Sequence, residues 1–107
     1  GPEFGRLMEI DGVQVRSQFL RRGAMLIELL FYVAPGYVGP ADRRPVNQLG
    51  LTHLNFRVDD VASVAAKLQE LGGTVLEHTR TTFSPEMDFV YCTDHDGTRV
   101  ELMKLPG

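Results

Sequence analysis

The chain has 107 residues, a formal net charge of −3 at pH 7, and ordinary shares of hydrophobic (43%) and charged (23%) residues. This length suits one domain with a modest core. The sequence has no basic stripe, which argues against a nucleic-acid partner. The apolar run over residues 24–34 is interrupted by Glu28 and is too short to span a bilayer. Cys92 is the single cysteine, so no internal disulfide can form, which suits a reducing cytoplasm.

The first half of the sequence predicts one hairpin followed by a linker. Residues 1–4, GPEF, are either a cleavage and cloning scar or native sequence. Residues 13–32 indicate a strand, a glycine turn and a second strand. The stretch APGYVGPADRRPVNQLG, residues 34–50, is rich in proline and glycine and is typical of a linker.

The second half of the sequence predicts a complete module that begins with a strand and a helix. Residues 51–59 alternate between apolar and polar types, as a half-buried strand does. Asp59 or Asp60 can cap the helix that follows, and Gly72-Gly73 ends it. The apolar face of this helix is predicted to consist of Val61, Val64, Ala65, Leu68 and Leu71.

Three further strands are predicted to complete this module. We expect them at residues 74–80, 88–93 and 98–104. A loop over residues 81–87 separates the first two, and the turn Asp94-His95-Asp96-Gly97 separates the last two. The predicted order is therefore strand, helix, strand, strand, strand.

Two parts of the chain share a pattern. Residues 13–32 and 88–104 each run from a strand through a glycine turn into an apolar strand that carries Glu-Leu, at Glu28 and at Glu101. Such a repeat predicts two modules of one α+β fold. We expect a partial βαβββ module over residues 1–33, the linker over 34–50 and a complete module over 51–107. The first module would lack its opening strand and helix in this chain.

Alternation along the strands predicts which side chains share a face. Leu54, Phe56 and Val58 should pack under the helix, while His53, Asn55 and Arg57 face away from it. On the last strand, Arg99 and Glu101 belong to the same uncovered face as His53.

A carboxylate in an apolar strand needs a partner. His53, Glu101 and Glu28 form a plausible ligand set for a divalent transition metal. The alternative is that His53 is a structural residue that pairs with Glu101 without a metal.

HLNFRVDDVASVAAKLQELGG, followed by FVYCTDHDGTRVELMK, resembles the vicinal oxygen chelate superfamily, which groups glyoxalases, bleomycin-resistance proteins and extradiol dioxygenases. The resemblance covers residues 51–105 and, more weakly, 6–33. It implies paired βαβββ modules that form a cupped mixed sheet. The second module is most similar to bacterial glyoxalase I. The usual Asp-Pro-Asp-Gly turn carries His95 in place of proline here.

The resemblance also implies a site and a chemistry. Metal-dependent members take ligands from the first and last strands of each module, which correspond to His53 and Glu101 in the second module and to Glu28 in the first. The expected cofactor is a divalent ion, Ni, Zn, Mn or Fe. The expected activity is that of a lyase or isomerase acting through an enolate-type intermediate on a small oxygenated substrate, with Glu28 or Glu101 as the catalytic base.

Two alternatives stay open. In an extradiol-type dioxygenase, Tyr91 would be the active-site tyrosine, although residues 82–84 lack the histidine that this pattern requires. In a metal-free small-molecule (drug) binding protein, aromatic residues would line a cleft. The candidate substrate-binding residues across these alternatives are Tyr91, Asn55, Arg57, Phe89 and Arg16, with Phe31, Tyr32 and Tyr37 as further aromatic candidates.

The expected assembly is a homodimer. A partial module leaves sheet edges exposed, and members of the superfamily commonly dimerise, some with swapped modules. The expected partners are thus a second copy of the chain and a small-molecule substrate, with no nucleic acid and no membrane, in the cytoplasm.

Overall fold

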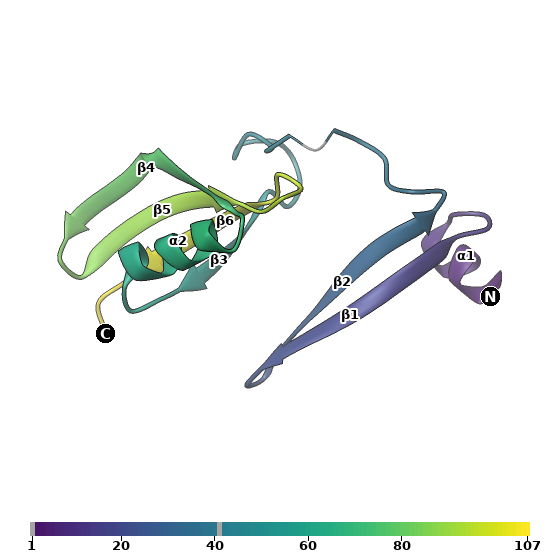
Figure 1. Cartoon of the computed structure of the whole chain (residues 1–107), viewed down its shortest axis with the longest axis horizontal. Helices are drawn as coiled ribbons and strands as arrows, with labels where there is room; N and C mark the ends of the chain where they lie inside the picture. The colour runs from purple at the N-terminus through teal and green to yellow at the C-terminus, as the bar shows by residue number, and fades with distance from the viewer. Residues whose placement is uncertain (1, 41) are drawn as a thin grey trace. The chain divides into compact units, whose positions relative to one another are not determined.

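The computed structural model describes residues 2–40 and 42–107, so Gly1 in the tag-like segment and Ala41 in the predicted linker lie outside the described residues. The chain divides into two compact units, residues 1–39 and 40–107 (Figure 1). We call them the hairpin unit and the module unit. Neither described helix has the length and apolar character needed to cross a membrane.

The hairpin unit consists of a short helix and two long strands. Strands β1 (Gln14–Arg22) and β2 (Met25–Ala34) pair antiparallel, with Phe19 opposite Glu28. Helix α1 (Pro2–Met8) was not predicted; a proline at the first helical position suits its start. Every described residue of this unit is at least partly exposed. The exposed large apolar side chains of its strands are Phe19, Leu20, Met25, Leu26, Leu29, Leu30, Phe31 and Val33.

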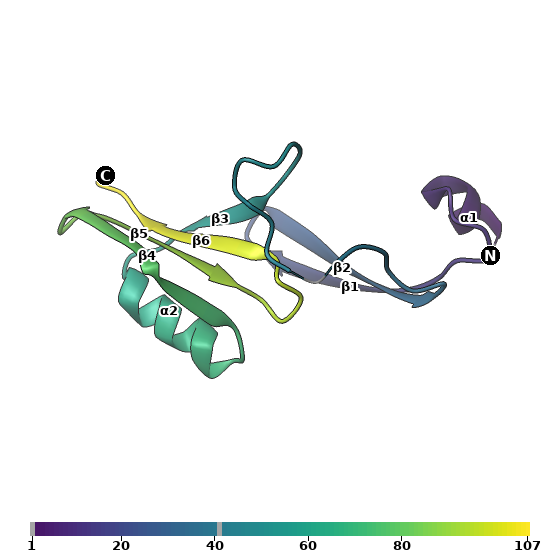
Figure 2. The ribbon, with the colours of Figure 1, turned by 90° about the horizontal axis from the view of Figure 1, so that it is seen from above.

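The module unit has the predicted βαβββ order. Its elements are β3 (His53–Arg57), α2 (Val61–Glu70), β4 (Thr74–Ser84), β5 (Met87–Thr93) and β6 (Arg99–Lys104). The sheet order is β3-β6-β5-β4, with β3 parallel to β6 and the other pairs antiparallel. Figure 2 shows α2 on one side of this sheet. The fold is α+β, as predicted.

Helix α2 is positioned by its cap and by its apolar face. Of the two predicted caps, Asp60 is the one used: its Oδ1 accepts from the Ser63 backbone N–H at 3.1 Å. Gly72, with a φ of 101°, follows the helix in a conformation that favours glycine. The buried core between α2 and the sheet consists of Val61, Ala65, Val90, Cys92 and Leu102. Burial raises the pKa of the Cys92 thiol, as befits a structural cysteine.

Two predicted core positions are wrong. Leu54 is 51% exposed, because α2 packs against β4, β5 and β6 and leaves the edge strand β3 uncovered at this end. Leu71 is 68% exposed, because it is the C-cap of α2 and no longer follows the helical face.

The loop predicted over residues 81–87 is also wrong. Strand β4 continues to Ser84 and forms a hairpin with β5, in which Thr82 lies opposite Asp88. The extra length is accommodated by an irregular stretch of β4 between Leu76 and Thr81. There the Thr79 hydroxyl donates to the Leu76 carbonyl at 2.6 Å and accepts from the Tyr91 N–H at 2.9 Å. A side chain thus satisfies backbone groups that a regular ladder would pair.

Candidate functional site

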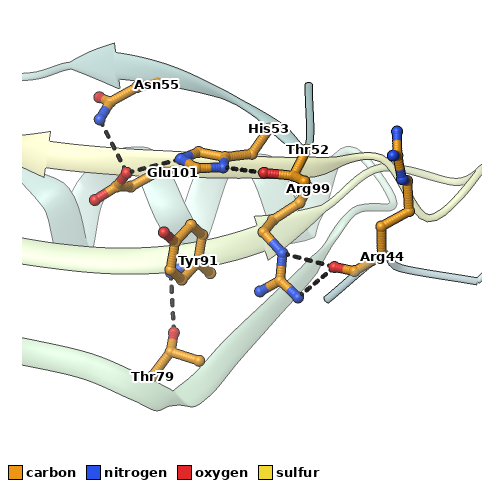
Figure 3. Close-up of polar contacts among 8 residues, drawn as sticks. All are labelled: Arg44, Thr52, His53, Asn55, Thr79, Tyr91, Arg99 and Glu101. Carbon is orange, nitrogen blue, oxygen red and sulfur yellow. Dashed lines mark hydrogen bonds and ion pairs between the residues drawn. The ribbon is translucent and has the colours of Figure 1, made fainter. Parts of the chain in front are cut away.

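Polar side chains gather on the face of the module sheet opposite α2. The strand register places Glu101 of β6 between Asn55 of β3 and Tyr91 of β5. His53 lies opposite Arg99, one step further along the same face. Figure 3 shows these side chains close together on the three neighbouring strands. The predicted alternation is therefore confirmed for this face.

Glu101 is the centre of the hydrogen bonding in this cluster. Its Oε1 accepts from Asn55 Nδ2 at 2.9 Å and lies 3.3 Å from His53 Nε2. The His53 and Glu101 side chains are 23% and 17% exposed. On the other side of the imidazole, His53 Nδ1 lies 3.0 Å from the Thr52 hydroxyl. The carboxylate that the sequence places in an apolar strand thus has two polar partners.

Tyr91 closes one side of the cluster. Its ring meets the His53 ring edge to face, with centroids 5.3 Å apart, and the Arg99 guanidinium carbon lies 4.9 Å from its centroid. Burial, and after it the Glu101 carboxylate, raise the pKa of Tyr91 above its ordinary value, while Arg99 opposes the shift. The phenol therefore keeps its proton at neutral pH and can donate a hydrogen bond to an oxyanion.

The spacing of His53 and Glu101 fits a shared metal ion. Two ligand atoms bound to one ion at about 2.1 Å lie about 3.0–3.4 Å apart in octahedral to tetrahedral geometry. The separation between His53 Nε2 and Glu101 Oε1 is 3.3 Å. Residues 2–40 and 42–107 contain no group of three or more His, Cys, Asp or Glu side chains that could hold a metal ion. A complete ligand set would need donors beyond this pair.

The remaining predicted residues are divided between the two units. Glu28 and Arg16 belong to the hairpin unit, where Glu28 Oε2 accepts from Ser17 Oγ at 2.5 Å. Arg57 Nη2 donates to the carbonyls of residues 105–107. Phe89 packs edge to face against Phe83, with centroids 5.8 Å apart. Arg57 and Phe89 thus have structural contacts of their own.

Arg99 and Arg44 were given no role from the sequence. Both line a cavity of about 380 Å³ that reaches His53. The guanidinium of Arg44 donates to the carbonyls of Leu51 and Leu49 at 2.7 and 3.1 Å, which braces the loop before β3. One feature of the sequence indicated that Arg99 belongs to the site: it stands two residues before Glu101 and therefore on the same face of the strand. The loop contacts are invisible to strand alternation.

Comparison with known proteins supports the fold. A glyoxalase family protein from Bacillus cereus is 21% identical, with a TM-score of 0.83; the match covers 99% of this chain and 72% of that one. A glyoxalase family protein from Enterococcus faecalis is 24% identical, with a TM-score of 0.57, over 92% of this chain and 82% of that one. At these identities the likeness establishes the fold alone.

No curated protein matches the chain. The profile of one superfamily does match, over residues 6–102, and so takes in both the hairpin unit and the module unit. The resemblance seen in the sequence is thereby confirmed: the chain belongs to the glyoxalase/bleomycin resistance protein/dioxygenase superfamily.

Proposed function

We propose that this protein is a metal-dependent lyase or isomerase that acts on a small oxygenated substrate through an enolate-type intermediate. The observation that supports the proposal is the placement of His53 Nε2 and Glu101 Oε1, 3.3 Å apart on neighbouring strands of the uncovered sheet face. For this reaction the two residues would hold a divalent ion, Ni, Zn or Mn. When bound, the ion supplies Lewis acidity toward two neighbouring substrate oxygens.

The other residues of the cluster have roles that follow from their contacts. The Asn55 amide, 2.9 Å from Glu101 Oε1, orients the carboxylate. Tyr91, as a neutral phenol, would donate to the oxyanion that develops on the substrate. Glu101 would move the proton at the carbon beside the carbonyl. Glu28, on the hairpin unit, stays our proposal for a third ligand and an alternative base.

Two rival functions predict different metal contents. An extradiol-type dioxygenase would use iron, and Tyr91, whose ring contacts that of His53, would be its active-site tyrosine. A metal-free small-molecule binder would use the cavity beside His53, whose volume of about 380 Å³ suits a small ligand. The bound metal therefore separates the three functions.

The test is elemental analysis of the purified protein after reconstitution with each metal. We expect a stoichiometric divalent ion, lost in His53→Ala and in Glu101→Gln. The matched control is His78→Ala, which removes an exposed histidine from β4 of the same sheet. Metal that persists in both site variants, or is absent from every protein, would refute metal binding at this pair. Iron in place of nickel or zinc would favour the dioxygenase.

We also propose that the chain works as a homodimer, with modules that complete one another, in the cytoplasm. The support is the hairpin unit: within residues 2–40 its sheet has two strands, and the described residues of these strands include eight exposed large apolar side chains. Sedimentation velocity across a range of concentrations would show a dimer. Replacing the exposed Leu29 with Asp should weaken it, whereas replacing Gln69, an exposed polar residue of α2 in the module unit, with Glu should not. A monomer at every concentration would contradict the proposal.

A further inference from the structure

Arg99 is a buried cation that has no acidic partner among the described residues. It is 7% exposed, and within the described residues no carboxylate lies within 4.0 Å of its guanidinium. Its contacts are the Arg44 backbone carbonyl, 2.8 Å from Nη2 and 3.3 Å from Nε, and the face of the Tyr91 ring. Burying a charge is costly unless it is paired. The site therefore favours an anion that would neutralise Arg99.

Arg80, on β4 of the same sheet, is an arginine that does have an acidic partner. Its Nε and Nη2 donate to the two carboxylate oxygens of Asp88 at 2.9 and 2.6 Å. The pair is bidentate, which is the strongest geometry for these groups. Arg80 thus has from its own chain the carboxylate that Arg99 lacks.

The unused edge of the Arg99 guanidinium can take a carboxylate. A guanidinium has five N–H donors. The edge formed by Nε and Nη2 faces the Arg44 carbonyl, so Nη1 and the remaining Nη2 hydrogen stay available at the end of the side chain. Two adjacent donors of this kind match the spacing of two carboxylate oxygens. The contact with Arg44 holds the fork in place, because it fixes the plane of the guanidinium.

Arg99 is also one of the residues that line the cavity of about 380 Å³. Arg99 and His53 line it together with the apolar side chains of Leu51 and Leu54, which are 92% and 51% exposed. Asp42 and Asp96 also line it, but both are exposed, so water screens their charges. The lining therefore combines one buried cation with an apolar surface.

We propose that this cavity binds a small monocarboxylate, whose carboxylate group is held end-on by Arg99 and whose carbon chain lies against Leu51 and Leu54. The site needs no metal ion, so it goes beyond the function proposed above. A purely structural role, in which Arg99 only anchors the loop at Arg44, would leave the protein without such binding.

The test uses the full chain, dialysed against EDTA so that metal chemistry does not contribute. Pentanoate is titrated into the protein, and binding is followed by calorimetry and by the NMR signal of the Arg99 Nε–H group. Pentanamide, which has the same shape without the charge, is the ligand control. The variants are Arg99→Lys and Arg99→Met, with Arg80→Lys as the matched control for loss of a guanidinium elsewhere in the sheet. The amide NMR spectrum of each variant reports on its fold.

We expect saturable binding of pentanoate, with a shift of the Arg99 signal, and affinity for pentanamide at least about tenfold weaker. Arg99→Lys should weaken pentanoate binding about tenfold, because a point charge replaces the fork. Arg99→Met should abolish binding while the fold persists, and Arg80→Lys should retain it. The proposal is overturned if wild-type protein does not saturate with pentanoate, if Arg99→Met binds pentanoate as well as wild type does, or if pentanamide binds as tightly as pentanoate.

Discussion

The hairpin unit and the module unit begin from the same local pattern and reach different degrees of burial. In both, a strand leads through a glycine turn into an apolar strand that carries Glu-Leu. In the module unit, α2 covers that strand, and Leu102 is buried at 2% exposure. In the hairpin unit, Leu29, the residue after Glu28, is 52% exposed. The two units differ because α2 covers the strand of the module unit, whereas no described residue of the hairpin unit is buried.

Strand β2 has the sequence of an internal strand. MLIELLFYVA is apolar at nearly every position, a pattern typical of strands that are covered on both faces. Two antiparallel strands alone offer too little surface for mutual burial. The sequence of the hairpin unit is therefore suited to being covered by a further layer, whereas the module unit covers its own sheet with α2.

The largest expected effect comes from separating the two units. A fragment of residues 40–107 should unfold cooperatively in denaturant and keep the helical circular dichroism of α2. A fragment of residues 1–39 should show no cooperative transition in water, because none of its described residues is buried. A cooperative transition in the shorter fragment would show that the hairpin unit is stable without a covering layer.

A smaller effect should follow from truncating equivalent leucines. Leu102→Ala in the module core should lower the free energy of unfolding by about 2–5 kcal/mol, because it leaves a cavity. Leu29→Ala in the hairpin unit should change it by less than about 0.5 kcal/mol in the monomer. Urea denaturation measures both. A loss from Leu29→Ala that grows with protein concentration would indicate that an assembly buries this residue.

The N-cap of α2 should contribute about 1 kcal/mol to the free energy of unfolding. Asp60→Ala removes the acceptor of the Ser63 N–H, whereas Asp59→Ala, at the neighbouring exposed position, should be nearly neutral. Thermal denaturation of the two variants measures the difference. Equal losses would show that the capping bond does not stabilise the module.

The smallest expected effect is the contribution of Asp88 to the pH dependence of the free energy of unfolding. Arg80, by hydrogen bonding, and Thr82 with it, hold the pKa of the Asp88 carboxyl below its ordinary value. Since the folded pKa is the lower one, the stabilisation is complete above the unfolded pKa of about 3.9 and is lost as the pH falls through the folded pKa. The stability of Asp88→Asn should therefore fall less steeply below about pH 4. Asp59→Asn is the control, and an identical slope in wild type and Asp88→Asn would refute the assignment.

Much of the module was predictable because its signals are local. The helical spacing after Asp60, the two glycines at its end and the alternation in LTHLNFRVD each depend on a few neighbouring residues. The faces of β3 and β6 follow from period two, so the meeting of His53 and Glu101 was also predictable once the two strands were taken as neighbours. The family resemblance rests on the same residues.

The sequence alone was sufficient to predict the βαβββ order, the polar face with its histidine and glutamate, and the superfamily. Only the tertiary structure decided which apolar positions are buried, since the exposure of Leu54 depends on where α2 lies over the sheet. It also decided that β4 extends to Ser84, because Thr79 satisfies backbone groups that a broken ladder would leave unpaired. The tertiary structure likewise decided that no described carboxylate lies within 4.0 Å of the Arg99 guanidinium. Charge pairing depends on distances in space, and the chain brings a carboxylate to Arg80 but not to Arg99 among its described residues.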